Sequence, residues 1–136
     1  DFLFSPDFLE YFHAMAPLLE HDLSTYVISA WNDNGLRGKV ADKANIHRSG
    51  FFPGLGWLLS RRLWEDELQP KWPHEHWDHW MRDNTQRRNR DSIFPEVPRD
   101  YHAGRKGTFM DEYHHNRYFK DIDYNTDPSF RWADGA

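Results

Sequence analysis

The stretch FFPGLGWLLSRRLWEDELQPKWPHEHWDHWMR, residues 51–82, decides how the rest of this 136-residue chain is organised. It holds five of the chain's seven tryptophans and begins with a Pro-Gly-x-Gly turn, whose glycines let a ligand approach the main chain closely. One carboxylate, Asp78, stands between Trp77 and Trp80. Because indoles exclude water from a charge beside them, Asp78 is a candidate general base. The alternative is an exposed helix acid flanked by core tryptophans.

A helix is expected near the beginning of the chain. Ser5 suits the N-cap, Pro6 the first helical position and Asp7 the first turn. The apolar residues that follow recur at the spacing of one helix face and are expected to be core residues: Phe8, Phe12, Met15 and Leu19. The sequence therefore predicts a helix that runs to about residue 20.

Strand and loop signals follow. The β-branched and aromatic run at 26–31 predicts a strand, and residues 57–59 predict a second, buried strand. A third strand is expected at 93–97, at a sheet edge, because Pro95 has no backbone N–H to donate. Residues 36–50 are polar and aperiodic, which is typical of a long surface loop.

Two further helices are expected inside the tryptophan-rich stretch. Ser60 is a good N-cap for a helix to about Leu68, which Pro70 ends. A short helix over about residues 75–82 then carries Asp78.

The length and composition of the chain exclude several classes of protein. The length suits one domain with a core of its own. A formal charge of −5 argues against a general nucleic-acid binder, and the absence of cysteine excludes both a disulfide framework and a thiolate metal site. The longest apolar run, residues 51–59, is interrupted by Pro53 and two glycines and is far shorter than the roughly 20 residues of a membrane span. Any membrane anchor is expected to lie outside this chain.

Two clusters have the residue types of ligand sites. His74, His76 and His79 resemble a short metal-binding tract, but their spacing matches no named zinc motif, and surface histidines are the alternative. Gly104-Arg105-Lys106-Gly107 is a basic loop able to hold a phosphate, although it lacks the Walker arrangement. The loop is a weak signal by itself.

The C-terminal part is expected to be less regular. Residues 113–119 predict a helical or irregular turn. From Asp121 onward the composition is acidic and polar, which is typical of a loosely packed tail.

Six strings in this order connect the chain to a known family. They are SPDFLEYF (5–12), SAWNDNG (29–35), FFPGLGWLL (51–59), PKWP (70–73), WDxWMR (77–82) and GRKG (104–107). Together they are similar to the catalytic domain of the β-1,2-N-acetylglucosaminyltransferases. The strings resemble most the members of N-glycan processing, with the members that act on O-mannosyl glycans second.

The resemblance implies an α/β fold, the C-terminal part of a GT-A (Rossmann-like) nucleotide-sugar glycosyltransferase domain. Residues 1–120 would belong to that catalytic domain, on its acceptor side, and residues 121–136 would form a polar tail. The nucleotide-binding half of the family precedes these residues, so the isolated chain is expected to be inactive. The family's Golgi-lumen location, with a type II membrane anchor outside this chain, would also apply.

The implied reaction inverts the anomeric centre. It moves GlcNAc from UDP-GlcNAc, with Mn²⁺, to the 2-hydroxyl of a mannose on a glycoprotein N-glycan. Asp78 falls on the family's catalytic base, and Asp1 falls on the last acid of a Glu-Asp-Asp metal motif. An inverting transfer needs one base and one metal-held diphosphate, and Mn²⁺ prefers hard oxygen ligands such as a carboxylate.

Donor contacts are implied by the same resemblance. Trp77 and Leu55 match residues that contact the donor, and Thr108 and Phe109 match a loop that orders over it. Thr108 and Phe109 depart from the small or aliphatic pair usual there, and His79 stands where an acid is frequent.

Two further positions depart from the family. Val27 and Ser92 stand where animal members carry cysteines, which implies that both cysteines of a disulfide have been lost together.

One rival function remains open. It is a non-catalytic carbohydrate-binding module that uses Trp72, Trp77 and Trp80 as stacking platforms.

Overall fold

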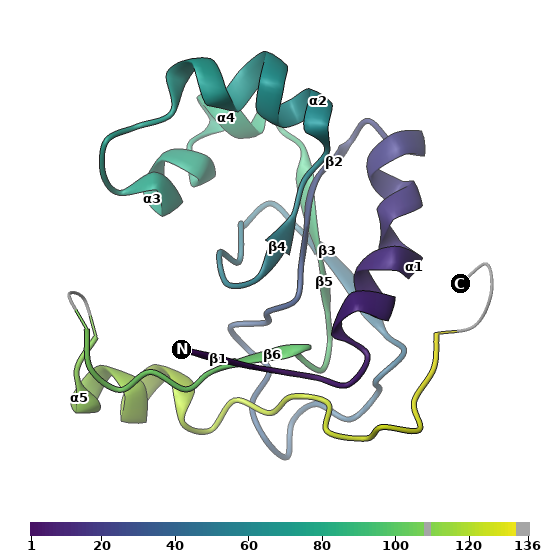
Figure 1. Ribbon diagram of the computed structural model, residues 1–136, viewed down its shortest axis with the longest axis vertical. Helices are drawn as coiled ribbons and strands as arrows, with labels where there is room; N and C mark the ends of the chain where they lie inside the picture. Colours follow the sequence, from purple (N-terminus) through teal and green to yellow (C-terminus); the bar gives the residue numbers. More distant parts are fainter. Residues whose placement is uncertain (108–109, 133–136) are drawn as a thin grey trace.

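The computed structural model describes residues 1–107 and 110–132 and has a mixed α/β architecture, as expected from the sequence (Figure 1). Its main sheet has four strands in the order β3-β5-β2-β4. Their bounds are Thr25–Ser29 for β2, Ile46–Ser49 for β3, Trp57–Leu58 for β4 and Asp91–Pro95 for β5. β2 and β5 are parallel, and the two outer pairs are antiparallel.

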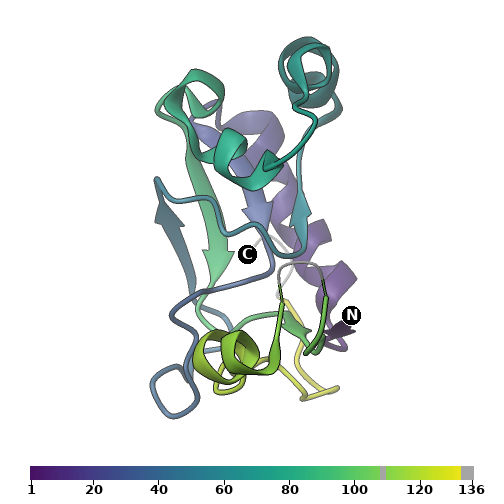
Figure 2. The same cartoon turned by 90° about the vertical axis from the view of Figure 1, so that its left-hand side faces the viewer.

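The central strand β2 is buried on both faces, because all five of its residues are buried. The helix α1 (Phe8–His21) packs along one face, and the helices that follow β4 lie on the other side (Figures 1 and 2). These helices are α2 (Arg61–Leu63), the π-helical turn η1 (Trp64–Leu68), the 3₁₀ turn η2 (Gln69–Lys71), α3 (Trp77–Arg82) and α4 (Asn84–Arg87). The sheet is thus the middle of three layers.

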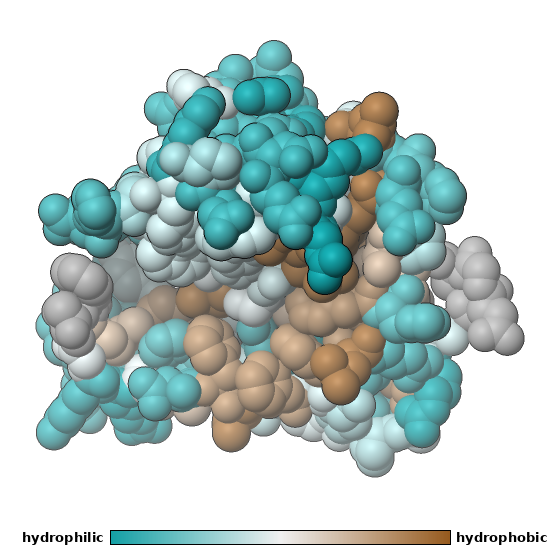
Figure 3. Space-filling model, turned by 45° about the horizontal axis from the view of Figure 1, so that its top comes forward, coloured by the Kyte–Doolittle hydropathy of each residue, from teal (hydrophilic) through white to brown (hydrophobic). Residues whose placement is uncertain are grey.

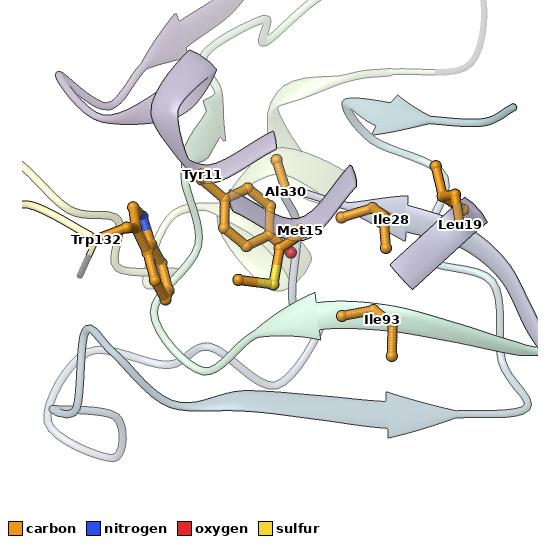
Figure 4. Close-up of a cluster of buried hydrophobic side chains, with 7 residues drawn as sticks. All are labelled: Tyr11, Met15, Leu19, Ile28, Ala30, Ile93 and Trp132. Carbon is orange, nitrogen blue, oxygen red and sulfur yellow. The ribbon is translucent and has the colours of Figure 1, made fainter. Parts of the chain in front are cut away.

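The α1 side of the core confirms most of the predicted helix face. Met15 and Leu19 are buried, whereas Phe8 and Phe12 are partly buried beside them. Tyr11, which the spacing did not include, is also buried, and its hydroxyl donates a 2.6 Å hydrogen bond to the Ser29 carbonyl. Figure 4 shows the buried members of this cluster: Tyr11, Met15, Leu19, Ile28, Ala30, Ile93 and Trp132. The N-cap position is Asp7 and not Ser5.

The other side of the core is built on the tryptophan-rich stretch. Its buried residues are Tyr26, Val27, Phe52, Leu63, Leu68 and Met81, and five partly buried tryptophans pack around them. Ser60 caps α2 as predicted, with its hydroxyl accepting from the Leu63 N–H at 3.1 Å. The helical turns continue past the expected end, since Pro70 lies inside the 3₁₀ turn, where its ring is tolerated near the start.

Two strand expectations were wrong. The segment 36–50, predicted to be a loop, contains β3, which pairs with β5 from Ile46 to Ser49. β5 is therefore flanked by β3 and β2 and is not an edge strand. Pro95 is compatible with this position because it is the last residue of β5.

A second, two-stranded sheet lies beneath the main one. β1 (Phe2–Phe4) pairs with β6 (Asp100–His102), and the chain continues into α5 (Glu112–His114) and the π-helical turn η3 (His115–Phe119). These last two elements confirm the helical turn predicted at 113–119. No helix in the described part of the chain is long and apolar enough to cross a bilayer.

The expected loose packing after residue 121 is contradicted. Ile122, Asn125 and Trp132 are buried. Asn125 Nδ2 donates to Asp7 Oδ1 at 2.7 Å, and Trp132 Nε1 donates to Asp7 Oδ2 at 3.0 Å. The polar composition of this segment led to a wrong prediction, because its polar groups form hydrogen bonds with other buried polar groups in the interior.

The centre of this packing is a buried ion pair. Arg99 Nε donates to Asp7 Oδ2 at 2.8 Å, and neither side chain is exposed. The Arg99 guanidinium also donates to the carbonyls of Val97 and Lys43, so both charges have hydrogen-bonding partners. Such pairing is what makes two buried charges tolerable.

Candidate functional site

A cleft of about 550 Å³ opens between the Pro-Gly-Leu-Gly turn, α3 and η3. Its lining includes Leu55, Trp77 and Asp78, three of the site residues that the family resemblance implies. The remaining lining residues are Asp33, Gly54, His76, His79, Arg82 and Phe119. In the space-filling view, hydrophobic residues gather across the middle of the face shown, below a hydrophilic upper region (Figure 3).

Asp78 faces the cleft from the first turn of α3. Its side chain is 41% exposed, and its carboxylate lies 3.5 Å from Arg82 Nη1, one helical turn later. The expected enclosure between two indoles is therefore absent, because the neighbouring tryptophans pack into the core while Asp78 faces solvent. An accessible carboxylate with a cation beside it has the geometry to accept a proton from a bound hydroxyl group.

Trp77 connects the cleft to the aromatic core. Its ring stacks on Trp57 at 5.6 Å between centroids and on Trp72 at 6.3 Å. Trp72 in turn meets Trp80 edge to face at 5.5 Å. The three tryptophans proposed as platforms of a binding module thus use much of their ring surface on one another, which disfavours that rival function.

The Pro-Gly-Leu-Gly turn is held by hydrogen bonds to two elements. The Ser29 hydroxyl donates to the Pro53 carbonyl at 2.7 Å, and the Ala30 N–H donates to the Gly56 carbonyl at 2.7 Å. On the α3 side, Arg82 Nε donates to the carbonyl of Phe52 at 3.0 Å. Leu55 is therefore presented to the cleft by a turn that is tied at both ends.

A carboxyl group that sequence reasoning missed lies beneath this turn. Asp100 is fully buried, and neither of its carboxyl oxygens has a hydrogen-bond partner in the described part of the chain. A Cβ atom on Gly56 would stand 2.1 Å from Asp100 Oδ2, and Gly56 has a φ of +63°. Burial raises the pKa of Asp100 to about 8, so the group is mostly protonated at pH 7.

Asp1 does not line the cleft. The Ala103 N–H donates to the Asp1 carbonyl at 2.8 Å, and a Cβ on Gly104 would be 3.0 Å from Asp1 Oδ2. Phe2 contacts His102, which stacks at 4.8 Å on Phe119 of the cleft wall. The structure thus brings Asp1 next to the Gly104 loop.

Asp1 fits one part of a manganese site. It is an exposed carboxylate, which is a hard oxygen ligand. Among residues 1–107 and 110–132 there is no cluster of three or more His, Asp or Glu side chains able to hold a metal. An ion bound here would therefore take its remaining oxygens from a diphosphate, water or other protein residues.

The structure does not support or does not describe the other site residues predicted from the sequence. His74, His76 and His79 do not form a metal cluster in the described residues, so the zinc alternative loses its support. Thr108 and Phe109 lie outside the described residues. Asp33, Arg82 and Phe119 were not singled out from the sequence, although Asp33 falls in the SAWNDNG string and Arg82 in WDxWMR.

Comparisons with known proteins identify the relatives of this chain. The GNT-I family model matches residues 1–133. An Arabidopsis thaliana protein, alpha-1,3-mannosyl-glycoprotein 2-beta-N-acetylglucosaminyltransferase, is 42% identical over 125 residues. The match covers 92% of this chain and 28% of that relative, so the chain spans little more than a quarter of the relative's length.

Proposed function

Because the chain belongs to the GNT-I family, we propose that the protein of which it forms part transfers GlcNAc from UDP-GlcNAc to the 2-hydroxyl of a mannose on an N-glycan. The observation that carries the proposal is the convergence of Leu55, Trp77 and Asp78 on one cleft. The name of the Arabidopsis relative supports the same reaction and N-glycan acceptors over O-mannosyl ones.

In this reaction the mannose oxygen attacks C1 of GlcNAc from the face opposite the diphosphate. The bond from C1 to the phosphate oxygen breaks, and its electron pair leaves with UDP. Asp78 accepts the proton of the attacking hydroxyl, and Arg82, 3.5 Å away, balances the carboxylate before transfer. Trp77 and Leu55 form apolar walls that position the donor sugar and keep water from competing with the mannose.

Three finer statements belong to the same proposal. Residues 1–120 form the acceptor side of a GT-A domain, whose nucleotide half is supplied by other residues. Asp1 would hold Mn²⁺, which when bound neutralises charge on the leaving diphosphate. The protein acts in the Golgi lumen. The family resemblance supports each of these, and the exposed carboxylate beside Gly104 adds to the second.

The decisive variant is Asp78→Asn in the full-length protein. The amide keeps the shape of the side chain but cannot take a proton, so we expect transfer to fall by about 10²- to 10⁴-fold. UDP-GlcNAc affinity should change little, since Trp77 and Leu55 are intact. Calorimetry for donor binding, thermal melting and transfer rates should be measured on one preparation.

Glu75→Gln is the matched control, because it neutralises a highly exposed acid three residues earlier. That variant should transfer at the parental rate. Near-parental transfer by a folded Asp78→Asn protein that binds donor would remove Asp78 from the mechanism.

A further inference from the structure

A second hollow of about 280 Å³ adjoins the cleft. The two share Asp33, which lines both. They also meet at Arg82, which lines the cleft and lies over the ring of Phe51 in the hollow, 4.6 Å from its centroid. A ligand seated beside Asp78 can therefore extend into the hollow without crossing the protein interior.

The lining of the hollow has the chemistry of a sugar site. Phe51 is 50% exposed and offers an apolar surface, and Phe94 contributes a second ring. Asp33, Asn34 and Ser49 supply a carboxylate, an amide and a hydroxyl around these rings. Mixed apolar surface with a few placed polar groups is typical of small-molecule sites, and a pyranose ring presents the matching faces.

Part of this polar lining is already fixed. Asn32 Nδ2 donates to the Glu96 carbonyl, and its Oδ1 accepts from the Asn34 N–H, both at 2.9 Å. Asp33 Oδ1 accepts from Trp31 Nε1 at 3.0 Å. These bonds hold the Asn32–Asn34 backbone in place, while no side-chain hydrogen bond engages the exposed Asn34 amide within the described residues. That amide remains available to a ligand hydroxyl.

We propose that this hollow, formed by Phe51, Asn34, Asp33 and Ser49, binds a second sugar ring of the acceptor glycan, next to the mannose that receives GlcNAc. The inference rests on the proposed function and deepens it, because it identifies the part of this chain that distinguishes a branched oligomannose from a lone mannose. Phe51 supplies the stacking surface, and Asn34 and Asp33 bind ring hydroxyls.

The test compares two acceptors in the full-length protein: methyl α-mannoside and a branched oligomannose glycan. The parent should use the branched glycan with the lower KM. Phe51→Ala and, independently, Asn34→Ala should each raise the KM for the branched glycan about tenfold. The KM values for methyl α-mannoside and for UDP-GlcNAc should stay within about twofold of the parent.

Controls separate recognition from structural damage. Phe51→Tyr keeps the ring and should retain the low KM. Phe4→Ala removes an exposed ring that packs on Phe8, away from the hollow, and should leave both acceptors unaffected. Because Arg82 touches both Phe51 and Asp78, a change in kcat for both acceptors would indicate damage to the cleft and not loss of a subsite.

Three results would overturn the proposal: a parent that does not distinguish the acceptors, equal KM changes for both, or no change in either variant. Direct titration with the branched glycan keeps the test separate from that of the proposed function. If the parent transfers nothing yet binds the glycan, and Phe51→Ala weakens that binding, the transfer function fails and the subsite stands. If the parent neither transfers nor binds, both fail.

Discussion

Replacing Asp100 by Asn should change how the stability of the protein depends on pH. In the folded chain this carboxyl is buried without a hydrogen-bond partner in the described part of the structure, and burial raises its pKa from 3.8 to about 8. The unfolded chain, in water, gives up the proton near pH 4. Between these values the folded state binds one more proton than the unfolded state, so the free energy of unfolding falls as pH rises.

The magnitude follows from the two pKa values. Each unit of difference is worth about 1.4 kcal/mol, so the whole penalty is on the order of 6 kcal/mol and is complete above pH 8. Between pH 5 and pH 7 alone, it grows by about 3 kcal/mol. An amide of nearly the same shape does not titrate, so Asp100→Asn removes this slope.

The assay is urea unfolding of the parent and of Asp100→Asn at pH 5, 6, 7 and 8. All other titrating groups are common to both proteins, so their contributions cancel in the difference. The difference in unfolding free energy between the variant and the parent should change in favour of the variant by about 3 kcal/mol from pH 5 to pH 7. This change corresponds to roughly 1 to 3 M in the urea concentration at the unfolding midpoint. A constant offset caused by burying an amide does not affect the slope.

Parallel stability curves from pH 5 to pH 8 would refute the reasoning. They would mean that Asp100 ionises alike in both states, through water or through a partner outside the described residues. A difference that moves in the opposite direction would mean that the folded state stabilises the carboxylate.

Three further changes have defined outcomes. Gly56→Ala should lower the melting temperature, because the new Cβ would stand 2.1 Å from Asp100 Oδ2 and the backbone φ at this position is +63°. Combining Gly56→Ala with Asp100→Ala should restore part of the lost stability, and strictly additive effects of the two changes would contradict the contact. Arg99→Met leaves Asp7 buried without its cation, so chemical denaturation should show about 3–5 kcal/mol less stability, whereas a near-neutral result would indicate that water reaches Asp7. Ser60→Ala removes the α2 cap and should cost about 1 kcal/mol in the same assay, with Ser60→Asp retaining the cap; equal stability of all three proteins would show that the cap contributes nothing.

Local patterns in the sequence predicted the elements whose causes are local. The helix face at Met15 and Leu19 and the cap at Ser60 depend on residues a few positions apart, and both were confirmed. β3 was missed because its IHRS segment has two exposed polar residues and becomes a strand only by pairing with β5, more than 40 residues later. Its composition alone resembles a loop.

The residues of the candidate site also fall into those visible in local sequence motifs and those brought together only by the fold. The Trp77-Asp78 dipeptide and the glycine turn were visible as motifs, and the structure places both on one cleft. Asp33 and Phe119 join that cleft only through the tertiary fold. Asp100 had no signal at all, because what makes it unusual is its position under Gly56, contributed by a segment more than 40 residues earlier.

The buried carboxylate of Asp7 also sets an order of events during synthesis. Its partners Arg99, Asn125 and Trp132 follow it by 92, 118 and 125 residues. At about 5–20 residues per second, a ribosome needs on the order of ten seconds to add the last of them. During that interval Asp7 remains hydrated, and the first turn of α1 cannot take its final place against the sheet. The nascent chain therefore completes this half of its core only after translation has passed residue 132, while the tryptophan cluster, whose residues all lie before Arg82, is free to assemble earlier.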